Sequence, residues 1–479
     1  MKRREFLRTA GIGAAGIALA AGRIADASVT LEKNRPNILF IFSDQQRHDT
    51  VGCYGADTMG SALNLSPNLD KMAADGVLFK YAFTAQPVCG PTRSIMQTGM
   101  YATETGCFTN DRALPLDAVT LPKVLRPAGY EVGYIGKWHL ASQGKEQNYR
   151  NSPVPKELRG GYDDFWLASD VLEFTSHGYD GHMFDGDNKQ VDFPEGKYRV
   201  DALTDFAIDY LRTRDGSKPF FLFLSYIEPH HQNDHNHFEG PIGSKEKFKD
   251  YPVPGDLEGT KGDWQEELPD YLGCCNSLDM AVGRLREELE QLGLADNTLV
   301  SYTSDHACHF RTRNSEYKRA CQDNAIRVPL IINGPGFKGG KVVEDLVSLI
   351  DLPPTVLTAG GAEVPSQMKG KPVQGLLDGN AEDWQKEVFV QISESHVGRA
   401  IRTKRWKYSV RAPQGNGGRD SGSDQYIEDF LYDLEDDPFE RNNLVKVPEH
   451  AQVREELRAR LIARMVEAGE QAPAILPVQ

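Results

Sequence analysis

Residues 37–44 read Asn-Ile-Leu-Phe-Ile-Phe-Ser-Asp, a nearly continuous apolar run that ends in an acid. A short apolar run of this kind is typical of a strand buried on both faces, as in a parallel sheet covered by helices. Similar runs occur at residues 130–135, 220–227, 298–302 and 328–332, with helical patterns between them. This alternation predicts an α/β fold with a large, mostly parallel sheet and helices on both faces.

Between these strands, helix signals and long polar segments alternate. Ser66-Pro67 opens a predicted helix that Gly76 closes, residues 119–125 form another, and residues 272–294 form a long amphipathic helix. Residues 141–199 and 231–269 are polar and lack periodicity. We therefore expect them to be long loops that wall a pocket.

The pattern changes after Gly360. Residues 387–392, 399–411 and 426–434 are typical of an antiparallel set of strands, and residues 448–469 of a closing helix. A chain of 479 residues is also longer than one core usually fills. We expect a catalytic domain over residues 28–380 and a smaller C-terminal α+β subdomain over residues 381–479.

Polar side chains follow several of the predicted strands within a few residues. They are Asp44, Lys137, His139, His230 and the pair Asp305-His306. Ligands in open α/β sheets bind at the carboxyl ends of the strands. We therefore expect these side chains to meet at one edge of the sheet.

Residues 89–93 read Cys-Gly-Pro-Thr-Arg, and Thr98-Gly99 follows them. Pro91 and Thr92 are able to open a helix, Arg93 adds a planar donor, and Gly99 is a plausible helix stop. Taken alone, Cys89 would usually be an ordinary buried cysteine, and Arg93 would usually be a surface charge. The fixed spacing of the whole set favours a functional site.

This stretch resembles the signature Cys-x-Pro-x-Arg, followed by Thr-Gly, of the formylglycine-dependent sulfatases, which have an alkaline-phosphatase-like α/β/α fold. The resemblance implies that a maturation enzyme oxidises Cys89 to formylglycine. The hydrated aldehyde would then supply the oxygen that attacks the sulfur of a sulfate ester, which an unmodified thiol cannot do. Residues 432–434 and 437–444 resemble the C-terminal subdomain of the same family.

The resemblance also implies roles for four further residues. Residues 136–139 match a Gly-Lys-Trp-His motif, in which Lys137 holds the sulfate and His139 takes a proton from the hydrate to release sulfate. His230 would protonate the leaving oxygen. Lys318 would be a second active-site lysine that, with Arg93, neutralises the developing charge.

A metal site is implied beside Cys89, with Asp44, Gln45, Asp305 and His306 as the other ligand candidates. The family commonly has an acid where this chain has Gln45, whose amide oxygen binds a hard cation but adds no charge. We expect calcium. Because His306 is a poorer partner for calcium than for transition metals, manganese stays open, and magnesium is a further alternative. Four residues predicted to lie near the rim are weaker candidates for binding a polar substrate: His309, Arg311, Arg313 and His396.

The N-terminus combines Arg3-Arg4 with a Gly- and Ala-rich run and a small-x-small site at residues 25–27. This resembles a twin-arginine signal peptide over residues 1–27, which implies export by the twin-arginine translocase to the periplasm or medium. The apolar run is too short for a membrane span. A formal net charge of −15 argues against a nucleic-acid partner, and seven cysteines without zinc-like spacing leave disulfide pairing open.

These features favour an exported, metal-dependent sulfatase, and the polar loops and export suit a sulfated glycan as substrate. A phosphonate monoester or phosphodiester hydrolase of the same superfamily is an alternative, because it shares the nucleophile motif. A catalytically silent glycan-binding protein is another. The proton-transfer groups His139 and His230 argue against that last reading, because binding alone would not require them.

Overall fold

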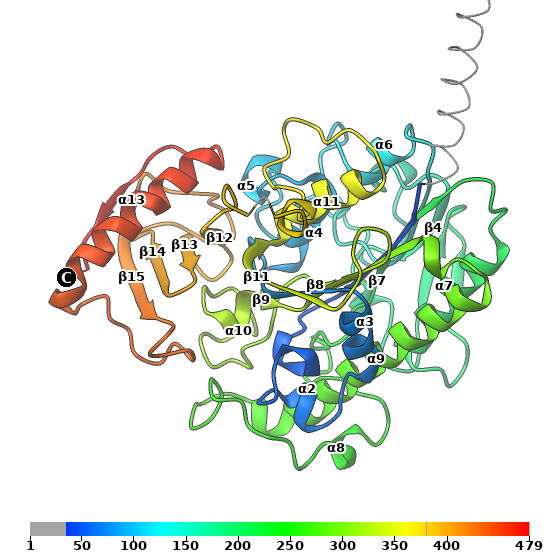
Figure 1. The fold of residues 1–479 in the computed structure, drawn as a ribbon, viewed down its shortest axis with the longest axis horizontal. Coiled ribbons are helices and arrows are strands. Elements are labelled where there is room, and N and C mark those ends of the chain that lie inside the picture. The colour runs from blue at the N-terminus through cyan, green and yellow to red at the C-terminus, as the bar shows by residue number, and fades with distance from the viewer. Residues whose placement is uncertain (1–34, 380, 479) are drawn as a thin grey trace, which may run out of the picture.

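An eleven-stranded mixed sheet forms the centre of the computed structural model, which describes residues 35–379 and 381–478 (Figure 1). The predicted signal peptide at residues 1–27 lies outside the described residues. Along the sheet, the strands are ordered as β11 (Lys341–Ser348), β2 (Val77–Phe83), β10 (Leu330–Asn333), β8 (Thr298–Ser304), β1 (Asn37–Ser43), β7 (Phe220–Ser225), β3 (Glu131–Lys137), β4 (Phe165–Ser169), β5 (His182–Asp185) and β6 (Gln190–Asp192), with β9 (Arg327–Val328) beside β2.

The five strands from β8 to β4 pair in parallel, and four of them, all except β4, match buried apolar runs predicted from the sequence. The run at 328–332 differs, because it divides into β9 and β10, and β10 runs antiparallel to both β2 and β8. The expected loop at 141–199 is also only partly irregular, since it contains β4, β5 and β6. The α/β class with a mostly parallel sheet is confirmed, with antiparallel pairs added toward both edges.

Alternate residues of β1 enter two different cores. Phe40 and Phe42 pack with side chains of α4 (Cys89–Thr98), α6 (Leu121–Leu125) and α11 (Leu352–Ala359). Leu39 and Ile41 pack with α3 (Pro67–Asp75), α7 (Arg199–Thr213) and α9 (Trp264–Gln291). Figure 1 shows α4 and α11 on one side of the sheet and α3 and α9 on the other. Helices therefore cover both faces, which explains why β1 is apolar at consecutive positions.

Helix α9 is longer than its amphipathic pattern predicts, because it starts at Trp264 and includes Pro269. Pro269 lies beyond the first turn, so it leaves the carbonyl of Gln265 without its helical donor, and the hydroxyl of Tyr251 donates to that carbonyl at 3.3 Å instead. The predicted loop before it is correspondingly shorter. The remaining α-helices are α2 (Met59–Ala62), α5 (Ala102–Thr105), α8 (Ser244–Lys247), α10 (Asp323–Ile326), α12 (Gln374–Leu377) and α13 (Ala451–Glu467). Within the described residues, no helix is both long and apolar enough to cross a membrane.

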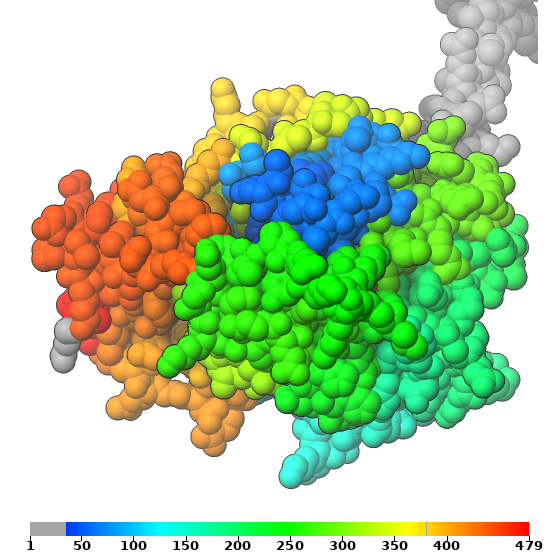
Figure 2. Space-filling view, turned by 90° about the horizontal axis from the view of Figure 1, so that it is seen from below, coloured from blue at the N-terminus to red at the C-terminus, as the bar shows by residue number. Residues whose placement is uncertain are grey.

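A second, five-stranded sheet follows in the C-terminal part, which lies at one end of the molecule (orange to red in Figure 2). Its strands are β12 (Glu387–Ile392), β13 (Gly398–Thr403), β14 (Trp406–Arg411), β15 (Gln425–Asp433) and β16 (Ala474–Leu476), antiparallel except for the last pair. Phe83 and Leu346 of the large sheet share one apolar cluster with Val388 and Val390 of β12. This cluster fixes the second sheet against the edge of the first.

Candidate active site

Backbone hydrogen bonds hold the ends of three parallel strands together. Asp44, directly after β1, donates its amide to the carbonyl of Glu228 beyond β7 at 3.1 Å. Asp305, directly after β8, donates its amide to the carbonyl of Ser43 at 3.1 Å. The Asp305 carboxylate accepts the amide of Gln45 at 2.9 Å. The carboxyl edge of the sheet therefore places these side chains within reach of one another, as the sequence predicts.

Helix α4 begins at Cys89, two residues before the position that Pro91 alone suggests. It ends where Gly99 adopts a left-handed conformation, with φ of 65°, and a Cβ at that position would lie 2.8 Å from Cγ of Met368. Every residue of the helix is buried. The amide of Gly90, at the start of the helix, donates to the side chain of Asn110 at 2.9 Å. The helix places Cys89 at the sheet edge.

The thiol of Cys89 is at the centre of the polar cluster. Its Sγ lies 2.8 Å from Nζ of Lys318, 3.4 Å from Oδ1 of Asp44 and 3.4 Å from Nε2 of His306. Burial, and then the negative charge of Asp44, raise the pKa of the Cys89 thiol to about 12. The unmodified thiol is thus protonated at neutral pH and is a poor nucleophile.

Three buried charges form a network beside Cys89. Oδ2 of Asp44 accepts hydrogen bonds from Nη2 of Arg93 at 3.0 Å and from Nζ of Lys137 at 2.9 Å. Burial alone would raise the pKa of Asp44, but the positive charge of Lys137 and of its cationic neighbours holds it well below the usual range. Asp44 is therefore an ionised carboxylate in the interior of the protein.

Asp44, Cys89, Asp305 and His306 are all buried, and one ligand atom from each lies within 4.8 Å of the others. Burial, and then repulsion by the nearby carboxylate of Asp44, raise the pKa of Asp305 to about 7. Oε1 of Gln45 and Oδ2 of Asp305 are also buried without a hydrogen-bond donor, and a divalent cation at this place would satisfy both oxygens. Carboxylate and amide oxygens are ligands that calcium and magnesium prefer, and the imidazole of His306 also suits manganese.

The turn after β3 places Lys137 and His139. At Gly136, φ is 105° and a Cβ would lie 1.9 Å from the carbonyl oxygen of Ser225 in β7, so only glycine fits there. The turn is anchored by Asp170 after β4, whose carbonyl accepts the amide of His139. Its carboxylate accepts the amides of three successive residues, Leu140, Ala141 and Ser142. The packing of β3, β7 and β4 thus sets the position of both predicted catalytic residues.

Two buried histidines lie near Cys89 in uncharged form. Burial, and then the positive charge of Lys137, hold the pKa of His139 well below its usual range. Burial, and then Lys318, do the same for His230. Nδ1 of each ring has no hydrogen-bond partner, while Nε2 of His230 lies 3.0 Å from Nζ of Lys318. Each neutral ring is chemically able to accept a proton.

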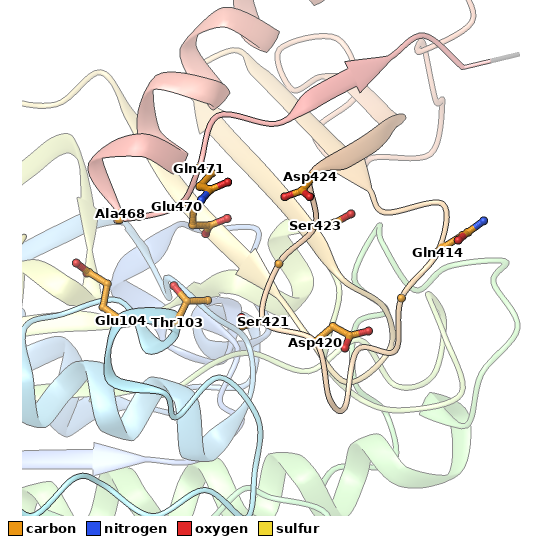
Figure 3. Close-up of a pocket in the computed structure, with 13 residues that line it drawn as sticks. Thr103, Glu104, Gln414, Asp420, Ser421, Ser423, Asp424, Ala468, Glu470 and Gln471 are labelled. Atoms are coloured by element: carbon orange, nitrogen blue, oxygen red, sulfur yellow. The ribbon is translucent and has the colours of Figure 1, made fainter.

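A cavity of about 340 Å³ opens onto Cys89. Its lining includes Gln45, His139, His230 and Lys318 from the predicted set. A larger hollow of about 610 Å³ lies between α5, which contributes Thr103 and Glu104, and residues of the C-terminal part such as Asp420, Asp424 and Glu470 (Figure 3). None of the predicted catalytic residues lines it, so we place the chemistry in the smaller cavity.

The four weaker substrate-binding candidates do not line the Cys89 cavity. His309 is buried, and its Nε2 donates to the carbonyl of Lys318 at 3.0 Å. Arg311 packs over the ring of Tyr317, Arg313 donates to the carbonyls of Phe439 and Glu440, and His396 contacts Ser395. Their placement gives no support to substrate binding and indicates instead that His309 positions Lys318.

Other residues line the cavity that the sequence analysis did not single out. They include Asn110, Asp111, Arg150, Glu173, Glu316, Arg319 and Glu394. Of these seven residues, only Glu173 is buried. Its Oε1 lies 3.0 Å from Nζ of Lys137. No motif marks it. The only signal was its place in the polar segment 141–199, which was expected to wall a pocket.

Comparison with known proteins agrees with this architecture. The profile of the sulfatase family matches residues 36–362, and the profile named N-sulphoglucosamine sulphohydrolase, C-terminal, matches residues 316–467. An ulvan-active sulfatase of Formosa agariphila is 30% identical over 92% of this chain and 83% of its own length. An N-acetylglucosamine-6-O-sulfatase of Bacteroides thetaiotaomicron is 26% identical over 89% of this chain and 85% of its own.

A solved structure, of a protein in complex with its substrate D-glucosamine-2-N,6-O-disulfate, superposes with a TM-score of 0.72 at 24% identity. It covers 91% of this chain and 98% of that one. At this level of identity, the likeness shows the fold. Since the sulfatase profile matches more than half of the chain, the protein belongs to the sulfatase family of the alkaline-phosphatase-like superfamily and is a sulfuric ester hydrolase.

Proposed function

We propose that this protein hydrolyses the sulfate ester of a carbohydrate and that Cys89 is the precursor of its nucleophile. The observation that carries the proposal is the position of Cys89 Sγ, between the cation of Lys318 and the carboxylate of Asp44 at the edge of the sheet. Formylglycine in place of Cys89 would supply, as its hydrate, an oxygen nucleophile at this position. The protonated thiol offers no such reactivity.

The fixed cations around Cys89 favour an anionic ester and the charge that develops on it. Arg93, Lys137 and Lys318 are all buried. The carboxylate of Asp44 orients Arg93 and Lys137, and the ammonium of Lys318 lies against Sγ of Cys89 and Nε2 of His230. Donors held in this way need no reorganisation during the reaction, which is the basis of electrostatic preorganisation. Lys137 would hold the sulfate, and Lys318 would face the ester oxygens beside Cys89.

His139 and His230 are the proposed proton carriers. His139 is neutral and has an unpaired ring nitrogen, so it is suited to take a proton from the nucleophile side and release sulfate. His230 shares a hydrogen bond with the ammonium of Lys318, so this pair together holds a proton that the leaving oxygen of the sugar needs. The two residues would act at different stages of one cycle.

Asp44, Gln45, Asp305 and His306 would hold the divalent cation, with calcium as the expected ion and manganese or magnesium as alternatives. When bound, the ion would offset the repulsion between the two carboxylates and polarise a sulfate oxygen. Asp44 connects the ion to the cation network through Arg93 and Lys137. Loss of either carboxylate would therefore disturb both.

A carbohydrate substrate is supported by the names of two relatives, which act on ulvan and on N-acetylglucosamine 6-O-sulfate groups. The cavity of about 340 Å³ lies at the lower end of the usual range for small-ligand sites, which suits one sugar unit. We further propose that residues 1–27 export the folded, matured enzyme by the twin-arginine route to the periplasm or medium.

The alternative within the same superfamily, a phosphonate monoester or phosphodiester hydrolase, has the same nucleophile motif and can carry the same Asp305-His306 metal pair. The two are separated by kcat/KM of the matured enzyme on 4-nitrophenyl sulfate, 4-nitrophenyl phenylphosphonate and a set of sugar monosulfates. The proposal expects the sulfate esters to be the better substrates. A clear preference for the phosphonate would favour the alternative, and binding of sulfated sugars without any turnover would favour a silent glycan-binding protein.

A further inference from the structure

Glu173 lies in the wall of the cavity, four residues beyond the end of β4. Its side chain is 5% exposed, and one of its oxygens, Oε1, lies 3.0 Å from Nζ of Lys137. Its backbone carbonyl accepts a hydrogen bond from the side chain of Gln232 at 2.9 Å. Glu173 is thus held from both ends, and its carboxylate is fixed next to a proposed sulfate-binding lysine.

The second oxygen of this carboxylate, Oε2, is buried and has no hydrogen-bond donor. Lys137 already uses its ammonium on both Asp44 and Oε1 of Glu173. A buried carboxylate oxygen without a donor costs free energy, and such atoms in active sites often mark the place of a ligand group. A donor that enters the cavity would satisfy this oxygen.

A second unpaired acceptor lies in the same wall. Oδ1 of Asp111 is also buried without a donor, while its other oxygen contacts Arg150. Arg150 in turn lies over the ring of Phe174, with 5.0 Å between the guanidinium carbon and the ring centroid. This wall therefore offers carboxylate oxygens to a substrate, beside the cations Arg150 and Arg319 that also line the cavity.

We propose that Glu173 is a specificity-determining residue, whose carboxylate accepts a hydrogen bond from a free hydroxyl or amino group of the sugar beside the sulfated position. The inference rests on the proposed function, because it assumes that a sugar sulfate occupies the cavity. The inference narrows the class of sugar sulfates that the enzyme would prefer. The preferred substrate has a donor next to the ester, and a second sulfate at that neighbouring position is unfavourable because two anions would meet.

The test is a double comparison on the matured enzyme. The probes are the monosulfates of galactose and N-acetylglucosamine, sulfated at each hydroxyl in turn. The best of them is then compared with analogues that have hydrogen in place of each neighbouring hydroxyl or amido group. Each substrate is measured by kcat/KM with the wild type and with Glu173→Gln, and 4-nitrophenyl sulfate, which has no hydroxyl, serves as the reference.

In the wild type, removal of one neighbouring donor should lower kcat/KM by about 10- to 100-fold, the usual value of a hydrogen bond to a charged group. In Glu173→Gln the same removal should cost less than about 3-fold. A matched control is Glu344→Gln, because Glu344 also pairs with a lysine, Lys80 at 2.9 Å, but it is exposed and does not line the cavity. Glu344→Gln should keep the wild-type response.

The inference is overturned if removal of each donor lowers kcat/KM equally in the wild type and in Glu173→Gln. That is the result expected of a residue that only positions Lys137, because its loss would lower kcat/KM on all substrates alike. Faster cleavage of a sugar with a second sulfate at the neighbouring position would also overturn it. Failure of the proposed function is distinct, since the wild type would then turn over neither the aryl sulfate nor any sugar sulfate, and the inference would fall with it.

Discussion

The ammonium of Lys318 lies 2.8 Å from the thiol of Cys89, although the two residues are 229 positions apart in the sequence. Helix α4 carries one of them and the loop after β8 carries the other, with His309 bound to the backbone of Lys318 behind it. A buried lysine beside a protonated thiol has no obvious structural purpose. It is well placed for an anionic substrate that reacts at position 89.

Replacement of Cys89 separates the nucleophile from the rest of the site. Cys89→Ala should lower turnover by several orders of magnitude and leave the melting temperature close to that of the wild type. Cys89→Ser should give at most one turnover, because a sulfated serine has no second hydroxyl to expel the sulfate. Single-turnover kinetics with intact-mass detection of the adduct measure both, and multiple turnover by Cys89→Ala would contradict the mechanism.

We expect metal binding and activity to depend on the carboxylates of Asp44 and Asp305. Chelation should inactivate the enzyme, and either Asp44→Asn or Asp305→Asn should lower both the bound metal per chain and the activity by more than about tenfold. Elemental analysis of purified protein gives the metal content and its identity. Asp351→Asn is the control, because Asp351 is equally buried but caps the turn before α11 and is not part of the cluster of metal-ligand candidates, so this variant should keep its metal. Full metal occupancy in both site variants would place the ion elsewhere.

The two histidines should differ in their dependence on the leaving group. His230→Ala should reduce kcat/KM strongly on a sugar sulfate and weakly on 4-nitrophenyl sulfate, whose phenolate leaves without protonation. His139→Ala should slow both substrates and let sulfated enzyme accumulate, since the leaving group is already gone at that stage. Equal losses on both substrates for His230→Ala, or an adduct trapped only by that variant, would reverse the assignment.

A buried ion pair next to the site should matter for stability. Nε of Arg199 lies 2.7 Å from Oε1 of Glu228, and both side chains are 1% exposed. Arg199→Ala should lower the free energy of unfolding by about 3–5 kcal/mol, because it leaves an uncompensated buried carboxylate. Lys189→Ala, which removes an exposed pair with Asp187, should change it by less than about 1 kcal/mol. Chemical denaturation measures both, and similar effects for the two variants would contradict this reading.

Much of the fold follows from short apolar runs in the sequence. Strands β1 and β7 are apolar at nearly every position because helices cover both faces of the sheet, and β8 is buried along its whole length although it includes Thr and Ser. All three strands were predicted, and the alternation of strands with helices predicted their parallel direction. Strand β11 was missed because Glu344 and Asp345 interrupt its apolar pattern at an exposed edge. The antiparallel direction of β10 could not be predicted, because the apolar pattern of a buried strand is the same whether the strand pairs in parallel or antiparallel.

The site shows the same division. Cys89, Lys137, His139 and His230 were found because they stand at fixed spacing in motifs or directly follow a strand. His309 and Arg311 were predicted to lie near the site, but their side chains turn to the backbone of Lys318 and to the ring of Tyr317, which the sequence does not reveal. Glu173 and Asp170 carry no motif, and only the pairing of β3 with β4 brings them to Lys137 and His139.

The most direct test of the account is mass spectrometry of the peptide that contains Cys89, purified from cells that contain a formylglycine-maturation enzyme, together with the sulfatase activity of the same sample. The account predicts that Cys89 has lost its thiol in favour of an aldehyde and that activity rises in proportion to the modified fraction. A fully active sample in which Cys89 is an unmodified cysteine would contradict it.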